Sequence, residues 1–162
     1  MGAKLARIDR IFSRGRQLED GGRLLHSSTR TVVNSLTRNN SSGDRRVLIV
    51  DDNVALAENI AEILELAGYV GEIAGSAEEA LPRALAAGIG FVITDFRLPG
   101  VDGAQLIKRL RLQGRQIRAV IISAYSDEAT ISAAREAGVD DFIPKPVDFA
   151  RLTRVLGVTG DA

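Results

Sequence analysis

The chain has 162 residues, no cysteine and one histidine, and its 21 basic and 21 acidic side chains cancel to a formal net charge of zero. This composition excludes a disulfide framework, a thiolate metal site and a cysteine nucleophile. Because no apolar run approaches the ~20 residues needed to span a bilayer and no signal-peptide core opens the chain, we expect a cytoplasmic protein.

Residues 1–44 differ in charge from the remainder and are predicted to form a basic N-terminal extension and linker. They carry eight Lys and Arg against four Asp and Glu, net +4, whereas residues 45–162 carry 13 against 17, net −4. Apolar residues at helical spacing between Leu5 and Phe12 predict that the extension is partly helical. A mobile tail and a helix that docks on a partner or pairs two chains are the two interpretations that stay open. Direct binding to nucleic acid is not expected, since the positive excess is small.

From residue 46 onward, short apolar runs alternate with segments of helical periodicity. The expected strands are 47–50, 70–74, 90–94, 119–122 and 141–143. The expected helices are 55–67, 76–87, a third beginning near 103, 127–137 and 148–157. Ser76 and Glu79 form a capping box at the start of the second helix, and Pro82 is expected to kink it.

This alternation predicts an α/β domain over residues 45–158. Strands of continuous apolar sequence, each followed by a helix, imply a parallel sheet covered on both faces. The flavodoxin-like strand order 2-1-3-4-5 is the expected topology, and it places the first and third strands side by side.

Three aspartates follow directly from this topology. Asp51 and Asp52 end the first strand and Asp95 ends the third, so all three are expected at one edge of the sheet. Two carboxylates 4 Å apart repel by about 4 kcal/mol at an effective dielectric of about 20, so protons or a cation must offset the charge. The oxygen ligands, with no nearby His or Cys, favour Mg²⁺ over zinc.

Two further polar residues are expected at the same edge. Lys145 follows the fifth strand and can supply a positive charge to a phosphoryl group, and Ser123 ends the fourth strand and can donate a hydrogen bond. A carboxylate nucleophile, a metal ion, a cation and a hydroxyl donor are the usual parts of a phosphoryl-transfer site.

Four segments at strand ends resemble the receiver domains of bacterial two-component response regulators. These segments are residues 47–52, 95–103, 121–124 and 142–146, and the resemblance covers about 46–157. One such segment alone is weak evidence, but four in order at strand ends are highly specific. The resemblance implies a phosphorylation-dependent signalling switch rather than an enzyme acting on an external substrate.

The family pattern implies a role for each aspartate. Asp95 would be the phosphoacceptor and would take phosphate from a histidine kinase or a histidine phosphotransfer protein. Asp52, Asp95 and the backbone carbonyl of Arg97 would bind Mg²⁺, and Asp51 would act through a bound water.

The pattern also implies a catalytic lysine and a two-position switch. Lys145 would contact the phosphoryl oxygens, and its peptide bond to Pro146 is expected to be cis. Ser123 would move toward the phosphoryl group and let Phe142 turn inward, which would remodel the face formed by residues 127–157. Phe142 stands where the family usually has tyrosine, so a permanently buried core residue is the competing interpretation. Arg97 and Tyr125 occupy variable positions that flank the phosphoryl group in the family.

Output is expected through protein contact or through the passing of phosphate in a relay. The chain is interpreted as a single-domain receiver with an N-terminal extension, or as the C-terminal piece of a hybrid kinase. A second copy of the chain is a candidate partner, through the face formed by residues 127–157 or through residues 1–44.

Two competing functions are weighed against this hypothesis. Loss of an acidic residue or of Lys145 would favour a receiver-shaped binding module that works without phosphorylation, and neither is lost. A phosphatase of the haloacid-dehalogenase type usually has a second aspartate two residues after its nucleophile, and Arg97 stands at that position.

Overall fold

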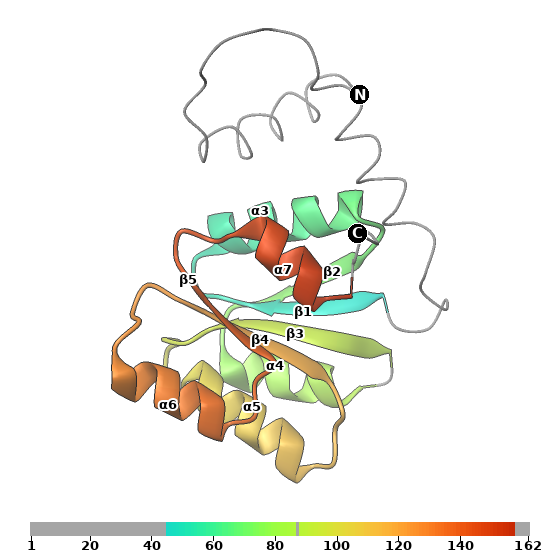
Figure 1. Cartoon of the computed structure of the whole chain (residues 1–162). Coiled ribbons are helices and arrows are strands. Elements are labelled where there is room, and N and C mark those ends of the chain that lie inside the picture. The colour runs from blue at the N-terminus through green and yellow to red at the C-terminus, as the bar shows by residue number, and fades with distance from the viewer. Residues whose placement is uncertain (1–44, 87, 158–162) are drawn as a thin grey trace, which may run out of the picture. The chain divides into compact units, whose positions relative to one another are not determined.

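The computed structural model describes residues 45–86 and 88–157, which form one sheet with helices on both faces (Figure 1). The strands are β1 (Arg46–Val50), β2 (Val70–Ala74), β3 (Ile89–Asp95), β4 (Arg118–Ser123) and β5 (Asp141–Pro144). The helices are α3 (Val54–Leu66), α4 (Ala77–Leu85), α5 (Gly103–Leu112), α6 (Glu128–Glu136) and α7 (Phe149–Val155). The predicted extension, residues 1–44, lies outside the described residues, as does residue 158.

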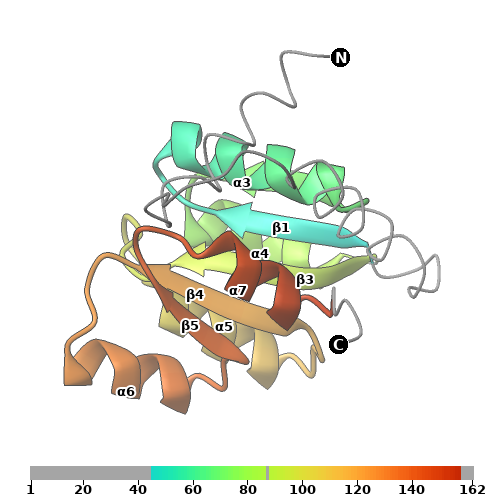
Figure 2. The same cartoon turned by 45° about the horizontal axis from the view of Figure 1, so that its top comes forward.

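All neighbouring strands are parallel, and their order is β2-β1-β3-β4-β5. The predicted flavodoxin-like topology is therefore confirmed. Helices α3 and α7 cover one face of the sheet, and α4, α5 and α6 cover the other (Figures 1 and 2). Because each face has its own buried apolar cluster, the central strands β1, β3 and β4 are enclosed on both sides. This enclosure explains why their sequences are continuous apolar runs.

Every described helix begins at a polar residue whose side chain accepts a hydrogen bond from the backbone three residues later. These N-caps are Asn53, Ser76, Asp102, Asp127 and Asp148. Such caps satisfy one of the otherwise unpaired N–H groups of the first turn. They fix the point at which each loop after a strand turns into its helix.

The second helix differs in detail from its prediction. Ser76 caps α4 as expected, but Glu79 accepts its hydrogen bond from the N–H of Gly75, one residue before the cap. The helix passes through Pro82 and ends at Leu85, two residues before the predicted end at residue 87, which is itself outside the described residues. Among the helices that the structure describes, none combines the length and apolar character needed to cross a membrane.

Candidate functional site

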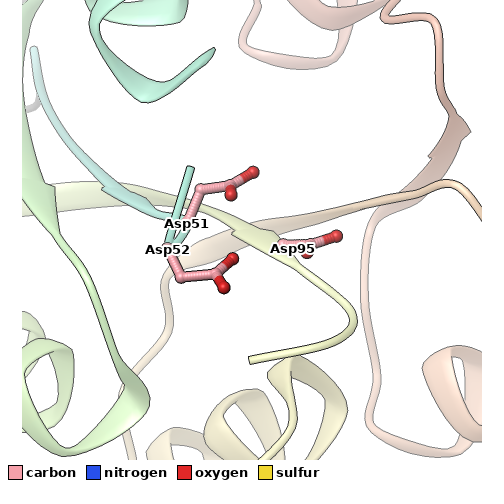
Figure 3. Close-up of side chains that lie close together, drawn as sticks. All are labelled: Asp51, Asp52 and Asp95. Carbon is pink, nitrogen blue, oxygen red and sulfur yellow. The ribbon is translucent and has the colours of Figure 1, made fainter. Parts of the chain in front are cut away.

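The three aspartates singled out in the sequence meet at the carboxyl edge of the sheet. Asp51 and Asp52 follow β1, and Asp95 ends β3, whose Thr94 pairs with Val50 of β1. One carboxylate oxygen from each residue lies within 4.8 Å of the others. Figure 3 shows the three carboxylates projecting to the same side of the strand ends.

The two aspartates after β1 differ in their surroundings. Asp51 is 3% exposed, and its Oδ1 accepts a hydrogen bond of 2.8 Å from the backbone N–H of Asn53. Its Oδ2 lies 3.3 Å from Nζ of Lys145. Asp52 is exposed to solvent. Asp51 is therefore fixed by the protein on both oxygens, whereas Asp52 is free to adapt to a ligand.

The backbone after Asp95 is held by a close approach of helix α5. Gly103, the first residue of α5, donates from its N–H to the carbonyl of Phe96 at 2.9 Å. A Cβ at Gly103 would lie 2.2 Å from the carbonyl oxygen of Asp95, so only glycine fits. The sequence predicted a helix beginning near residue 103 but gave no signal of this close approach, which depends on how α5 packs against the end of β3.

Lys145 connects the fifth strand to the aspartates of the first and third. Its Nζ lies 3.3 Å from Oδ1 of Asp95 and 3.3 Å from Oδ2 of Asp51. Its backbone N–H donates to the carbonyl of Ser123 at 2.7 Å. The bond between Lys145 and Pro146 is cis, as the resemblance implied.

The charge balance of this cluster leaves room for a cation. Burial raises the pKa of Asp95 above its ordinary value of 3.8, Lys145 opposes this change, and Asp51 adds to it. One ammonium group faces two largely buried carboxylates, and a third carboxylate is close by. All the ligand atoms that the cluster offers are carboxylate oxygens, which suit a hard divalent ion such as Mg²⁺.

Ser123 and Phe142, the predicted switch residues, lie on neighbouring strands. Ser123 ends β4, is 1% exposed, and accepts a hydrogen bond at Oγ from the N–H of Tyr125 at 3.0 Å. Phe142 in β5 is partly buried and packs against the apolar cluster on the α4, α5 and α6 side. The Phe142 ring is therefore in contact with the core but is still partly exposed to solvent.

Arg97 and Tyr125 are brought together at the rim of the site. The guanidinium carbon of Arg97 lies 3.8 Å from the centre of the Tyr125 ring, and both residues are exposed. The family resemblance implied that both residues flank the expected phosphoacceptor, but the contact between them was not predicted, since nothing in their spacing indicates it.

Residues 47–157 match the family model for the response regulator receiver domain. A response regulator receiver protein of Anaeromyxobacter sp. strain Fw109-5 is 40% identical over 108 residues, which cover 67% of this chain and 45% of that protein. The photosynthetic apparatus regulatory protein RegA of Cereibacter sphaeroides is 31% identical over 119 residues, which cover 74% of this chain and 65% of that protein. The chain thus spans about half the length of the curated relatives it matches.

Solved structures agree with this match. A response regulator receiver protein from Pseudomonas putida superposes with a TM-score of 0.67 at 30% identity, over 74% of this chain and 100% of that one. A response regulator protein from Burkholderia pseudomallei, solved with a phosphorylated aspartic acid, a calcium ion and citrate, gives a TM-score of 0.64 at 31% identity. That match covers 70% of this chain and 66% of the other.

Proposed function

The chain belongs to the response regulator receiver family, and from this premise we propose that it is a phosphorylation-dependent switch whose phosphoacceptor is Asp95. Receiver domains of two-component systems are signalling components, and their regulation acts through one aspartate. Asp95 is supported as that residue because it ends the central strand β3 and is paired with Lys145. The phosphodonor is a histidine kinase or a histidine phosphotransfer protein.

The proposed reaction transfers a phosphoryl group from a donor nitrogen to a carboxylate oxygen. An oxygen of Asp95 attacks phosphorus, the new P–O bond forms an acyl phosphate, and the P–N bond breaks. The electron pair of that bond stays on the departing imidazole, which has kept or takes up a proton. Lys145 neutralises charge on the phosphoryl oxygens, and Ser123 donates its hydroxyl hydrogen to one of them. The only reactions that the protein would catalyse are the transfer of phosphate to its own Asp95 and the hydrolysis of the resulting acyl phosphate.

The acidic cluster is proposed to hold a divalent cation during this reaction. Asp52, Asp95 and the backbone carbonyl of Arg97 would bind Mg²⁺, and Asp51 would act through a bound water; the ion would supply positive charge that neutralises the transferred group. The raised pKa of Asp95 and the oxygen-only ligand set support this assignment. The Burkholderia relative carried a calcium ion together with its phosphorylated aspartate.

The observation that carries the proposal is the position of Lys145 between Asp51 and Asp95, 3.3 Å from each. A receiver-shaped module without phosphorylation would need neither the lysine nor the buried carboxylate it faces.

After phosphorylation of Asp95, movement of Ser123 and Phe142 is proposed to change the face formed by α6, β5 and α7, which would contact the output partner or a second copy of the chain. The basic residues 1–44 are proposed as an extension that modulates such contacts.

The test is the intact mass of the wild type and of Asp95→Asn after incubation with Mg²⁺ and phosphoramidate or acetyl phosphate. Asparagine keeps the shape of the side chain but loses the nucleophilic carboxylate. We expect a gain of one phosphate, about 80 Da, in the wild type only. An equal gain in Asp95→Asn would move the acceptor to another residue. No gain in a protein that also fails to bind Mg²⁺ would favour the phosphorylation-independent module.

A further inference from the structure

Arg97 and Tyr125 form an exposed stack that links two loops next to Asp95. Arg97 lies in the loop after β3, and Tyr125 lies in the loop after β4. Their separation of 3.8 Å places the positive charge directly over the aromatic face, where the ring attracts it electrostatically. The stack therefore connects the loop that follows the proposed phosphoacceptor to the loop that leads into α6.

The backbone of Tyr125 extends this connection to Ser123. The N–H of Tyr125 donates to Oγ of Ser123 at 3.0 Å, and the carbonyl of Ser123 accepts from the N–H of Lys145 at 2.7 Å. Because Ser123 is buried, its hydroxyl has little access to water as an alternative hydrogen-bond partner when the loop moves. A displacement of Tyr125 would therefore break or move the hydrogen bond that holds the Ser123 hydroxyl.

Asp127 adds a second attraction for Arg97 from the same loop. It is the N-cap of α6, and hydrogen bonds from Thr130 lower its pKa, with the positive charge of Arg97 adding to the effect. Asp127 is therefore ionised at neutral pH and presents a negative charge to the guanidinium. Because both groups are exposed, the attraction is modest and easily overcome by a stronger anion.

We propose that the Arg97–Tyr125 stack is a latch that holds the loop between β4 and α6, and with it Ser123, in its resting position. The inference rests on the proposed function, because a phosphoryl group on Asp95 is what opens the latch. Arg97 follows Asp95 by two residues, at most about 7 Å of extended chain, so its side chain can reach that group. Charge-assisted hydrogen bonds to a phosphoryl dianion are stronger than an exposed cation–π contact, so Arg97 changes partner and releases Tyr125.

The test compares Tyr125→Leu, which removes the aromatic face and leaves Arg97 in place, with Tyr125→Phe, which keeps the face. The first measurement is amide hydrogen exchange over residues 124–127 in the unmodified full chain. The second is the rate of phosphate gain from phosphoramidate with Mg²⁺, followed by intact mass. We expect faster exchange and an about two- to fivefold faster phosphate gain in Tyr125→Leu, the size of one exposed cation–π contact. Tyr125→Phe should behave as the wild type in both measurements.

The outcomes separate this inference from the proposed function. If the wild type takes up phosphate but Tyr125→Leu exchanges at the wild-type rate, or gains phosphate more slowly, the latch is wrong and the phosphoacceptor assignment stands. If the wild type neither takes up phosphate nor binds Mg²⁺, the proposed function is wrong, and the opening of the latch is wrong with it. Denaturant unfolding of each variant checks the fold, and little change is expected because Tyr125 is 45% exposed.

Discussion

Replacing Asp95 by asparagine is expected to stabilise the metal-free protein at neutral pH, although it removes the proposed reactive group. The carboxylate of Asp95 is only 12% exposed, and it lies beside the almost fully buried Asp51. Asparagine has nearly the same shape and keeps an oxygen that can accept a hydrogen bond from Lys145. The substitution therefore removes one negative charge and changes the packing little.

The size of the effect follows from the charges around Asp95. Lys145, 3.3 Å away, attracts the ionised carboxylate by ~5 kcal/mol at an effective dielectric of ~20. Asp51, whose nearest oxygen is within 4.8 Å, repels it by ~3.5 kcal/mol on the same scale. The exposed Asp52 lies within the same distance and adds a repulsion that water screens. Because the two repulsions offset most of the attraction by Lys145, the cost of burying the charge decides the sign, and burial is also the main reason that the pKa of Asp95 is raised. After screening by water on the open side, we expect a gain of about 1–2 kcal/mol in Asp95→Asn.

The gain should depend on pH in a defined direction. A raised pKa means that folded Asp95 holds its proton at pH values where the unfolded chain has lost it. The wild type therefore loses stability relative to Asp95→Asn as the pH rises from 3.8 through the raised pKa, and the full difference is present above it. Below 3.8, Asp95 is protonated in both states and the two proteins should unfold alike.

Urea unfolding at several pH values, with a chelator and then with Mg²⁺, measures the difference. Mg²⁺ at one hundred times its dissociation constant should stabilise the wild type by about 2.7 kcal/mol and Asp95→Asn by less. Glu58→Gln removes an exposed charge on α3 that is not part of the acidic cluster, and should change stability by under about 0.5 kcal/mol. If Asp95→Asn is less stable than the wild type at pH 7 without metal, attraction by Lys145 exceeds the burial cost, and the electrostatic argument for a cation is refuted.

Two other substitutions test the geometry of the site. Lys145→Met should destabilise the metal-free protein by about 1–3 kcal/mol, because Asp51 and Asp95 lose the lysine with which both pair. Mg²⁺ should restore most of this stability. If urea unfolding shows no loss of stability in Lys145→Met, the pairing of Lys145 with the two aspartates is contradicted. Gly103→Ala should cost about 3 kcal/mol in the same assay, since a Cβ would meet the carbonyl of Asp95 at 2.2 Å. Gly114→Ala, which introduces strain at φ +74° but meets open space, should cost only about 1–2 kcal/mol; equal costs would remove the steric argument for Gly103.

The fold could be predicted closely because its signals are local in sequence. Each strand is a short apolar run, and most helices stop near a glycine, such as Gly68 and Gly138, whose φ values of +84° and +76° end the helical turn. Positions where prediction and structure differ, such as the end of α4, lie at helix ends, where a proline and fraying compete with the helical pattern.

The aspartates and Lys145 could be predicted for a different reason. A parallel sheet collects the residues that follow its strands at one edge, so topology alone brings Asp51, Asp95 and Lys145 together. Individual side-chain contacts could not be predicted in this way. The Arg97–Tyr125 stack depends on side-chain rotamers and on the paths of two loops, and the ion pair of Arg151 in α7 with Asp141 in β5 depends on side-chain rotamers; the sequence pattern specifies neither.

Lys145 contacts the ends of three strands, so a change of charge at Asp95 can affect all three. Its side chain pairs with residues at the ends of β1 and β3, and its backbone N–H holds the end of β4 through Ser123. Lys145 also directly follows β5 (Asp141–Pro144), the strand that carries Phe142. If Asp95 is phosphorylated as proposed, we expect the phosphoryl group to draw Nζ of Lys145 toward itself and to pull on the end of β5, while Arg97 moves in the loop after β3 and Ser123 moves at the end of β4. The two movements converge on the face formed by α6, β5 and α7, where we expect phosphorylation to change the contacts offered to a partner.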